Sequence, residues 1–185
     1  MEDILKNNCN KYKTMHLYAL LFFILTVSIR CFITVFLSES KELIYLQNNL
    51  NISLNIVFVI SMLVNIFNLL IIVNLTYLFL NVINILFERI DFKSFEVKKL
   101  IYLCYTLPFI LNNLLLSLLN LSKIMSETLI NFSSIFVYLL VSISIYFVLK
   151  EILQSKVIHK IGPIVVFFIN NIFTIIYFIK EVWIN

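Results

Sequence analysis

The sequence predicts an all-α fold, a polytopic bundle of five membrane-spanning helices. Of the 185 residues, 62% are hydrophobic and only 13% are charged, and the mean hydropathy is +1.02. Soluble domains are about 45–50% apolar and about 25% charged. So short a chain cannot hide this much apolar surface from water. Lipid must therefore be most of its solvent, and we expect residues 1–185 to form a single transmembrane domain.

The second observation is the run Ile52–Phe87, which contains 36 residues without a charge, a glycine or a proline. As one helix it would be about 54 Å long, whereas the hydrocarbon core of a bilayer is about 30 Å thick. It either crosses once and extends beyond the bilayer, or folds back as a hairpin. Because the run has no turn residues, we favour one long second helix.

The third observation is that short polar segments divide the chain into apolar runs of spanning length. The first run is too long for a cleaved signal peptide and lacks a cleavage site. Gly162-Pro163 is the strongest turn signal and precedes the last span, and Pro108 is expected near the start of the third. The predicted spans are about 17–37, 56–84, 100–121, 129–149 and 164–179.

Basic residues predict the orientation, because cytoplasmic connections carry an excess of Lys and Arg. With five crossings and a cytoplasmic N-terminus, the cytoplasmic segments hold ten of them and the outer segments three. The outer three are Lys41, Lys123 and Lys180. No basic block is dense enough for a nucleic-acid site. We therefore expect the N-terminus in the cytoplasm and the C-terminus outside.

Polar side chains recur at helical spacing within the spans, and those on one face should point into the bundle, where an amide finds partners. Interhelical hydrogen bonding is the structural interpretation, and a polar path or pocket for a small solute is the functional one. The faces are Asn74, Asn81, Asn84 and Glu88 in the second span; Asn113 and Asn120 in the third; Ser134, Tyr138, Ser142, Tyr146 and Lys150 in the fourth; and Asn170, Thr174, Tyr177 and Glu181 in the fifth.

Arg30 is a charge inside the first span, where a charge is expensive. It either snorkels to the outer interface, or makes a buried pairing with Glu39, Glu42 or an anionic ligand.

The motifs of catalysis are missing from the sequence. It contains no HExxH, and a single glycine excludes a Gly-rich phosphate loop. The three cysteines form no CxxC pair. We expect no enzymatic activity, no cofactor and no metal.

One segment resembles the Yip family of five-span membrane proteins. Phe92-Lys93-Ser94-Phe95 and the run Leu100–Pro108 are similar to a cytoplasmic connection of that family and to the Tyr-x-x-Pro opening of the next span, with Tyr105 and Pro108 at the motif positions. Ile145–Ile152 is similar to the end of the family's fourth span. The resemblance covers about residues 75–155 and implies a five-span architecture.

These observations favour a non-enzymatic integral membrane protein that acts by helix–helix contacts with another membrane protein. It would be an accessory subunit of a transport or secretion complex, or a self-protection protein against a membrane-active peptide. The alternative is a small-solute permease or solute-binding subunit that uses Asn74, Asn81 and Asn84. We expect a bacterial plasma membrane, with the endoplasmic reticulum or Golgi membrane as the alternative.

Overall fold

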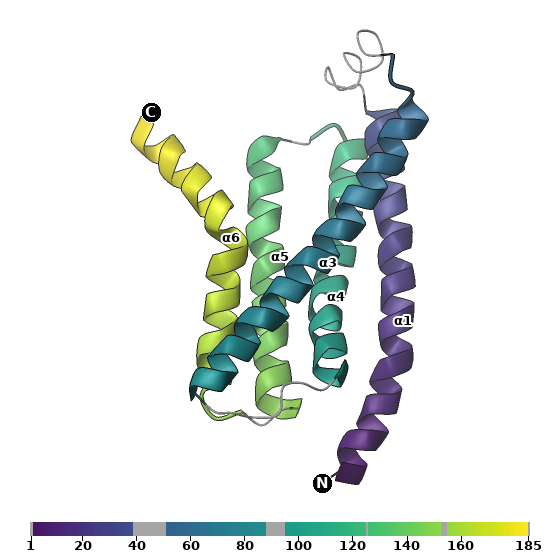
Figure 1. Ribbon diagram of the computed structural model, residues 1–185. Helices are drawn as coiled ribbons and strands as arrows, with labels where there is room; N and C mark the ends of the chain where they lie inside the picture. The colour runs from purple at the N-terminus through teal and green to yellow at the C-terminus, as the bar shows by residue number, and fades with distance from the viewer. Residues whose placement is uncertain (1, 39–50, 88–94, 125, 153–154, 185) are drawn as a thin grey trace.

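The computed structural model describes residues 2–38, 51–87, 95–124, 126–152 and 155–184, which are helical except for short connections and contain no strand. The chain is drawn in Figure 1. Its elements are α1 (Glu2–Phe32), the π-helical turn η1 (Ile33–Leu37), α3 (Leu54–Phe87), α4 (Phe95–Leu121), α5 (Glu127–Phe147), the π-helical turn η2 (Val148–Ile152) and α6 (Ile158–Ile184).

Within the described residues, four helical segments are long and apolar enough to cross a membrane: Met15–Leu37, Leu54–Phe87, Val97–Leu121 and Thr128–Glu151. In α6, the apolar stretch within the described side chains is shorter, Ile158–Ile172. The all-helical class is therefore confirmed, together with four segments of spanning length.

The helix α3 is continuous over 34 residues, so the segment does not fold back between Leu54 and Phe87. At about 1.5 Å per residue it is about 51 Å long. Only five of its residues are buried, at spacings of three or four: Leu69, Val73, Thr76, Leu80 and Asn84. It therefore packs on the other helices along a narrow stripe, and none of its residues before Leu69 is buried. Figure 1 shows it crossing the bundle obliquely.

The helix α4 lies at the centre of the bundle. It packs against α1 on one side and α5 on the other, α6 packs on α5, and α3 touches α1, α4 and α6. The start of α1, the end of α3 and the start of α6 lie at one end of the bundle, and the two termini lie at opposite ends (Figure 1). The core where these helices meet contains Phe23, Val27, Val73, Leu80, Ile101, Tyr105, Val141, Ile145, Ile158 and Val166.

The connection between α4 and α5 is closed by local hydrogen bonds. Lys123 has a left-handed backbone conformation with φ 57°, and its N–H donates to the Asn120 carbonyl at 3.1 Å. The next N–H, from Ile124, reaches back to the Leu119 carbonyl at 3.2 Å. These two bonds form a Schellman motif that ends α4. Ser126 then caps α5, because its side chain accepts from the Leu129 N–H at 3.3 Å.

Gly162 and Pro163 lie inside α6 rather than in a turn, so the turn prediction is wrong. A Cβ at Gly162 would lie 2.9 Å from Leu80 Cδ2 and 3.2 Å from Leu149 Cδ1. The chain's single glycine therefore serves close packing of α6 on α3 and η2. Pro163 is tolerated early in the helix, where it removes one backbone donor.

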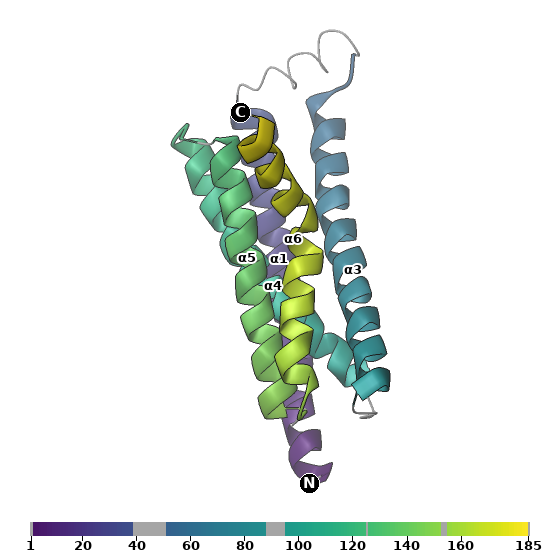
Figure 2. The same ribbon diagram turned by 90° about the vertical axis from the view of Figure 1, so that its left-hand side faces the viewer.

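Pro108 also lies within a helix, in the middle of α4 rather than near the start of the third span as predicted. It cannot donate to the Cys104 carbonyl one turn earlier. Figure 2 shows the axis of α4 changing direction along its length, and proline is a common cause of such a bend.

Candidate functional site

The Tyr105 side chain on α4 is fully buried, and its hydroxyl contacts polar side chains on two other helices. Its hydroxyl oxygen accepts a hydrogen bond from Asn170 Nδ2 on α6 at 2.6 Å. The same hydroxyl lies 2.5 Å from Thr76 Oγ1 on α3, which can accept its proton. Three helices are thus joined at one hydroxyl. Of these residues, Asn170 belongs to the polar face predicted for the fifth span, and Tyr105 is a predicted site only through the Yip resemblance.

The intramembrane charge and one of the predicted amides pair with each other. Arg30 Nη1 on α1 donates to Asn113 Oδ1 on α4 at 3.1 Å. Arg30 is partly exposed, whereas Asn113 is buried with 2% of its surface exposed. The predicted pairing with Glu39 or Glu42 lies outside the described residues.

A contact between α4 and η1, which directly follows α1, fixes the level of this pair. Asn120 Nδ2 donates to Thr34 Oγ1 at 3.2 Å. Arg30 lies four residues before Thr34, about 6 Å along the helix axis. Asn113 lies seven residues before Asn120, about 10 Å along the axis of α4. The guanidinium therefore reaches toward the middle of the bundle, away from the end of α1.

Helix geometry favours an inward direction for the Arg30 side chain, whereas snorkelling stays a prediction. In a helix every Cα–Cβ bond tilts toward the N-terminus. Arg30 lies in the second half of its span, so its side chain starts out toward the centre of the membrane. Snorkelling to the nearer end would work against that tilt.

On α3, the predicted polar face is not the face that packs. Asn84 is buried, Asn81 is half-buried and Asn74 is exposed, and Glu88 lies outside the described residues. Asn74 donates to the Leu70 carbonyl at 2.6 Å and interacts with the Tyr102 side chain on α4. Helical spacing shows which residues share a face, but the packed stripe of α3 is displaced around the helix and includes only Asn84 of the three described residues.

A second polar stripe on α3 was missed, although Ser61, Asn65 and Asn68 have the i, i+4, i+7 spacing that could have revealed it. Asn65 Nδ2 donates to the Ser61 carbonyl at 2.8 Å and lies 3.9 Å from Cys31 Sγ on α1. Asn68 is exposed, and the structure gives its side chain no hydrogen bond to any described residue. The stripe thus extends from the contact between Asn65 and Cys31 of α1 to the exposed amide of Asn68.

The predicted face of α5 lies partly against α4 and partly against α6. Ser134, Tyr138 and Tyr146 are half-buried, Ser142 is buried and Lys150 is exposed. Tyr138 packs on Phe109 of α4, with ring centroids 5.8 Å apart.

Beside Ser142, α5 and α6 form an open groove of about 400 Å³. Its lining is mostly apolar and aromatic: Leu139, Ser142, Ile143, Tyr146, Phe147, Pro163, Ile164, Phe167 and Phe168. A groove with this lining suits acyl chains or apolar side chains better than a polar solute.

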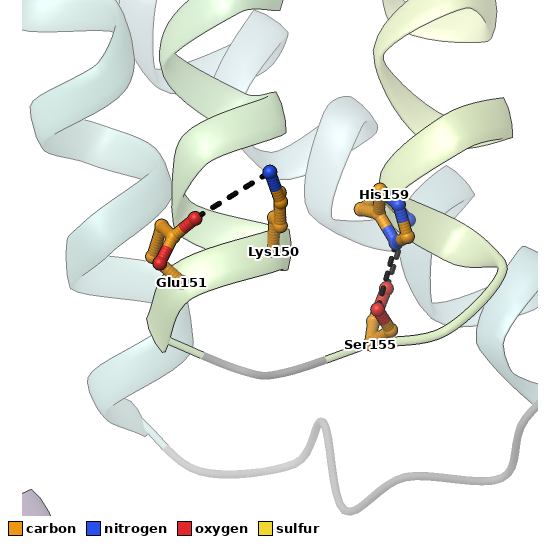
Figure 3. A network of polar contacts seen from close by, with 4 residues as sticks. All are labelled: Lys150, Glu151, Ser155 and His159. Atoms are coloured by element: carbon orange, nitrogen blue, oxygen red, sulfur yellow. Dashed lines mark hydrogen bonds and ion pairs between the residues drawn. The ribbon is translucent and has the colours of Figure 1, made fainter.

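Polar groups gather at the end of α5 and the start of α6, shown in Figure 3. Lys150 Nζ lies 3.7 Å from Glu151 Oε1 and 5.6 Å from the Tyr146 ring centroid. Ser155 Oγ accepts from the His159 N–H at 2.8 Å, and His159 Nδ1 lies 2.7 Å from the Ser155 carbonyl. All of these contacts join residues close in sequence, and Ser155 satisfies one backbone N–H in the first turn of α6, that of His159.

In α6, Asn170 and Thr174 are half-buried. The side chains of Tyr177 and Glu181 lie outside those described. Asn171, adjacent to Asn170, is fully buried and donates to the Phe167 carbonyl at 3.0 Å.

No protein-family model, curated protein or solved structure matches the chain. The fold and its apolar helices define the class, a helical integral membrane protein.

Proposed function

We propose that this chain is an integral membrane protein that acts by helix–helix contacts with another membrane protein. It is an accessory subunit of a membrane transport or secretion complex, or a self-protection protein, and it has no catalytic activity. The observation that carries the proposal is the exposed amide of Asn68 near the middle of α3.

An amide facing hydrocarbon without a partner loses several kcal/mol of hydration, about 2–7 kcal/mol on common scales. Asn68 lies among exposed apolar side chains, Val64 one turn before it and Ile71 one turn after it. In membranes, amides form interhelical hydrogen bonds. A polar helix of a partner packed on this side of α3 would satisfy Asn68.

The other polar groups support contact rather than solute passage. The hydrogen bonds of Tyr105 and Arg30 join helices within this chain. The groove between α5 and α6 is lined mainly by apolar groups. Asn74, which the permease alternative requires on an inner face, is exposed.

Five spans with a cytoplasmic N-terminus are part of the proposal. The start of α1, the end of α3 and the start of α6 share one end of the bundle (Figure 1). Ten Lys and Arg residues belong to the sequence segments predicted to be cytoplasmic, which begin or end at these helix ends. Such an excess marks the cytoplasmic side. The proposed location is a bacterial plasma membrane. The Yip resemblance supports the five-span arrangement. Its two motif residues, Tyr105 and Pro108, are both buried residues of α4.

Site-specific photo-crosslinking in the native membrane tests the proposal. A benzophenone amino acid is placed at Val64 or Ile71, which flank Asn68, and at Phe136 on α5 as an equally exposed apolar control. We expect one discrete crosslinked partner from the α3 positions and none from Phe136. Asn68→Leu should remove the crosslink, and Asn68→Gln should largely retain it.

Two results would contradict the proposal. One is identical crosslinking from all three positions, which indicates random collisions in the membrane. The other is Asn81-dependent uptake of a solute by the purified protein in liposomes, which would establish the permease.

A further inference from the structure

The Arg30 guanidinium has more donors than the described residues have acceptors for it. Arginine carries five N–H donors and cannot lose its charge in a protein. Its hydrogen bond within the described residues is to a neutral amide oxygen, Asn113 Oδ1. A charge inside a membrane span is normally paired with an opposite charge or several backbone carbonyls.

The environment of Asn113 adds a second, independent sign of a missing acceptor. Arginine can only donate, so the amide of Asn113 must turn its oxygen to Arg30 and its Nδ2 away from it. That Nδ2 is buried and has no hydrogen-bond partner among the described residues. The backbone carbonyl of Asn113 already accepts a hydrogen bond from Ser117 Oγ at 2.7 Å. The pair is thus rich in donors and positively charged.

The depth of the pair decides what kind of anion can reach it. Asn113 lies eight residues before the end of α4, about 12 Å along the helix axis, and Arg30 lies about 10 Å from the end of η1. Lipid phosphates lie outside the hydrocarbon core, within headgroup layers about 5–8 Å thick on each side. The guanidinium is directed toward the bundle centre, away from those phosphates. An acidic side chain on a neighbouring membrane helix can lie at this depth.

We propose that Arg30 is the docking point for a carboxylate carried by a membrane helix of the partner protein. Two carboxylate oxygens match the planar fork of the guanidinium better than any single acceptor. The inference names the partner's chemistry and rests on the proposed function, since it requires a partner helix beside this bundle. Arg30 remains partly exposed, which leaves room for that contact.

The test uses the full-length protein in phosphatidylcholine vesicles and a defined probe. The probe is a lysine-flanked polyleucine helix of about 20 residues with one Glu at the level of Arg30. The matched peptide carries Gln instead. Association is measured by energy transfer between labelled protein and labelled peptide, in alkaline buffer so that the carboxyl is ionised. We expect the Glu peptide to bind roughly tenfold more tightly than the Gln peptide.

Two substitutions assign that preference to Arg30. Arg30→Gln should bring the ratio of the two affinities close to one. Asn113→Asp should also abolish the preference, because it gives Arg30 an internal carboxylate, and it should stabilise the protein rather than unfold it. Loss of preference in both variants, with opposite effects on stability, separates binding from folding. An unchanged ratio in the Asn113→Asp protein overturns the proposal.

Three further outcomes would also overturn it. One is Arg30-dependent displacement of the Glu peptide by phosphatidylglycerol, which would identify a lipid phosphate as the ligand. Another is competition by free acetate, which would identify a small carboxylate solute. The third is a preference seen only after Glu39→Gln or Glu42→Gln, which would show that the chain's own carboxylate pairs with Arg30. None of these peptide experiments uses the native partner. Their outcome therefore does not depend on whether the crosslinking at α3 succeeds or fails.

Discussion

The Nδ2 atom of Asn170 on α6 donates to the hydroxyl of Tyr105 on α4, across a distance of 2.6 Å. The two helices lie on either side of α5 in the order of packing, and Thr76 adds α3 to the same hydroxyl. The contact therefore ties the end of the chain to its centre. It also shows how the bundle uses polar groups, which join helices that share little apolar surface.

Removing the Tyr105 hydroxyl should measure the strength of this junction. Tyr105→Phe leaves the ring in place and leaves Thr76 and Asn170 without their shared partner. We expect a loss of about 1–3 kcal/mol in the free energy of unfolding, from two interhelical hydrogen bonds and the unpaired groups left behind. Unfolding by sodium dodecyl sulfate in mixed micelles gives the value.

Tyr138→Phe is the matched control, because the Tyr138 ring is also packed in the bundle, on Phe109. The structure gives its hydroxyl no hydrogen bond to a described residue, so this change should have a smaller effect. Equal losses from both substitutions would show that the hydroxyl of Tyr105 is not the cause.

Gly162 should resist enlargement, although alanine is the better helix former. At an unhindered helical site, Gly→Ala gains about 1 kcal/mol. Here the new methyl group would meet Leu80 Cδ2 at 2.9 Å and Leu149 Cδ1 at 3.2 Å. We expect Gly162→Ala to lower the free energy of unfolding by about 1–3 kcal/mol, as overpacking does.

A double-mutant cycle separates this close contact from other effects of the substitution. Leu80→Ala alone leaves a cavity, but it also removes the atom that would clash. The two changes together should cost less than the sum of the separate losses. Strict additivity would mean that α6 moves away from α3 instead of pressing on Leu80.

The positions of the helices could be predicted from the sequence because long apolar runs and short charged connections are local features. Leu54–Phe87 is one helix for the same reason, since nothing in the run favours a turn. Gly162 could not be interpreted in this way. A glycine in a turn and a glycine beneath a neighbouring helix look the same in sequence, and only the approach of Leu80 distinguishes them.

The candidate site was predicted only in part, for a related reason. Periodicity places Asn74 and Asn84 on one face of α3, yet it does not say which side of α3 meets the bundle, and Asn74 is exposed. Pairing partners on other helices, such as Thr76 for Tyr105, require the tertiary arrangement. The direction of Arg30 was available from the sequence, because the tilt of a helical side chain depends only on helix direction.

Single cysteines at the two ends of the bundle should report the proposed orientation. Ser122 directly follows α4 and Lys156 comes shortly before α6, and both are exposed. The end of α4 and the start of α6 lie at opposite ends of the bundle (Figure 1). Each residue is replaced by cysteine in a chain whose own three cysteines are changed to alanine. A membrane-impermeant maleimide added outside intact cells should label Ser122→Cys and leave Lys156→Cys unmodified until the membrane is opened. The reverse pattern would place the N-terminus outside.

Lys123 is a position at which relief of backbone strain should stabilise the protein. Its φ of 57° lies in the left-handed region, which is unfavourable by about 1–2 kcal/mol for a residue with a Cβ. Glycine is the usual residue at this place in a Schellman motif. Lys123→Gly should therefore raise the free energy of unfolding by about 1 kcal/mol. Lys123→Ala is the control for the lost charge, because it removes the ammonium group and keeps the Cβ. If the two variants unfold at the same denaturant concentration, the left-handed conformation at Lys123 is not the source of the change.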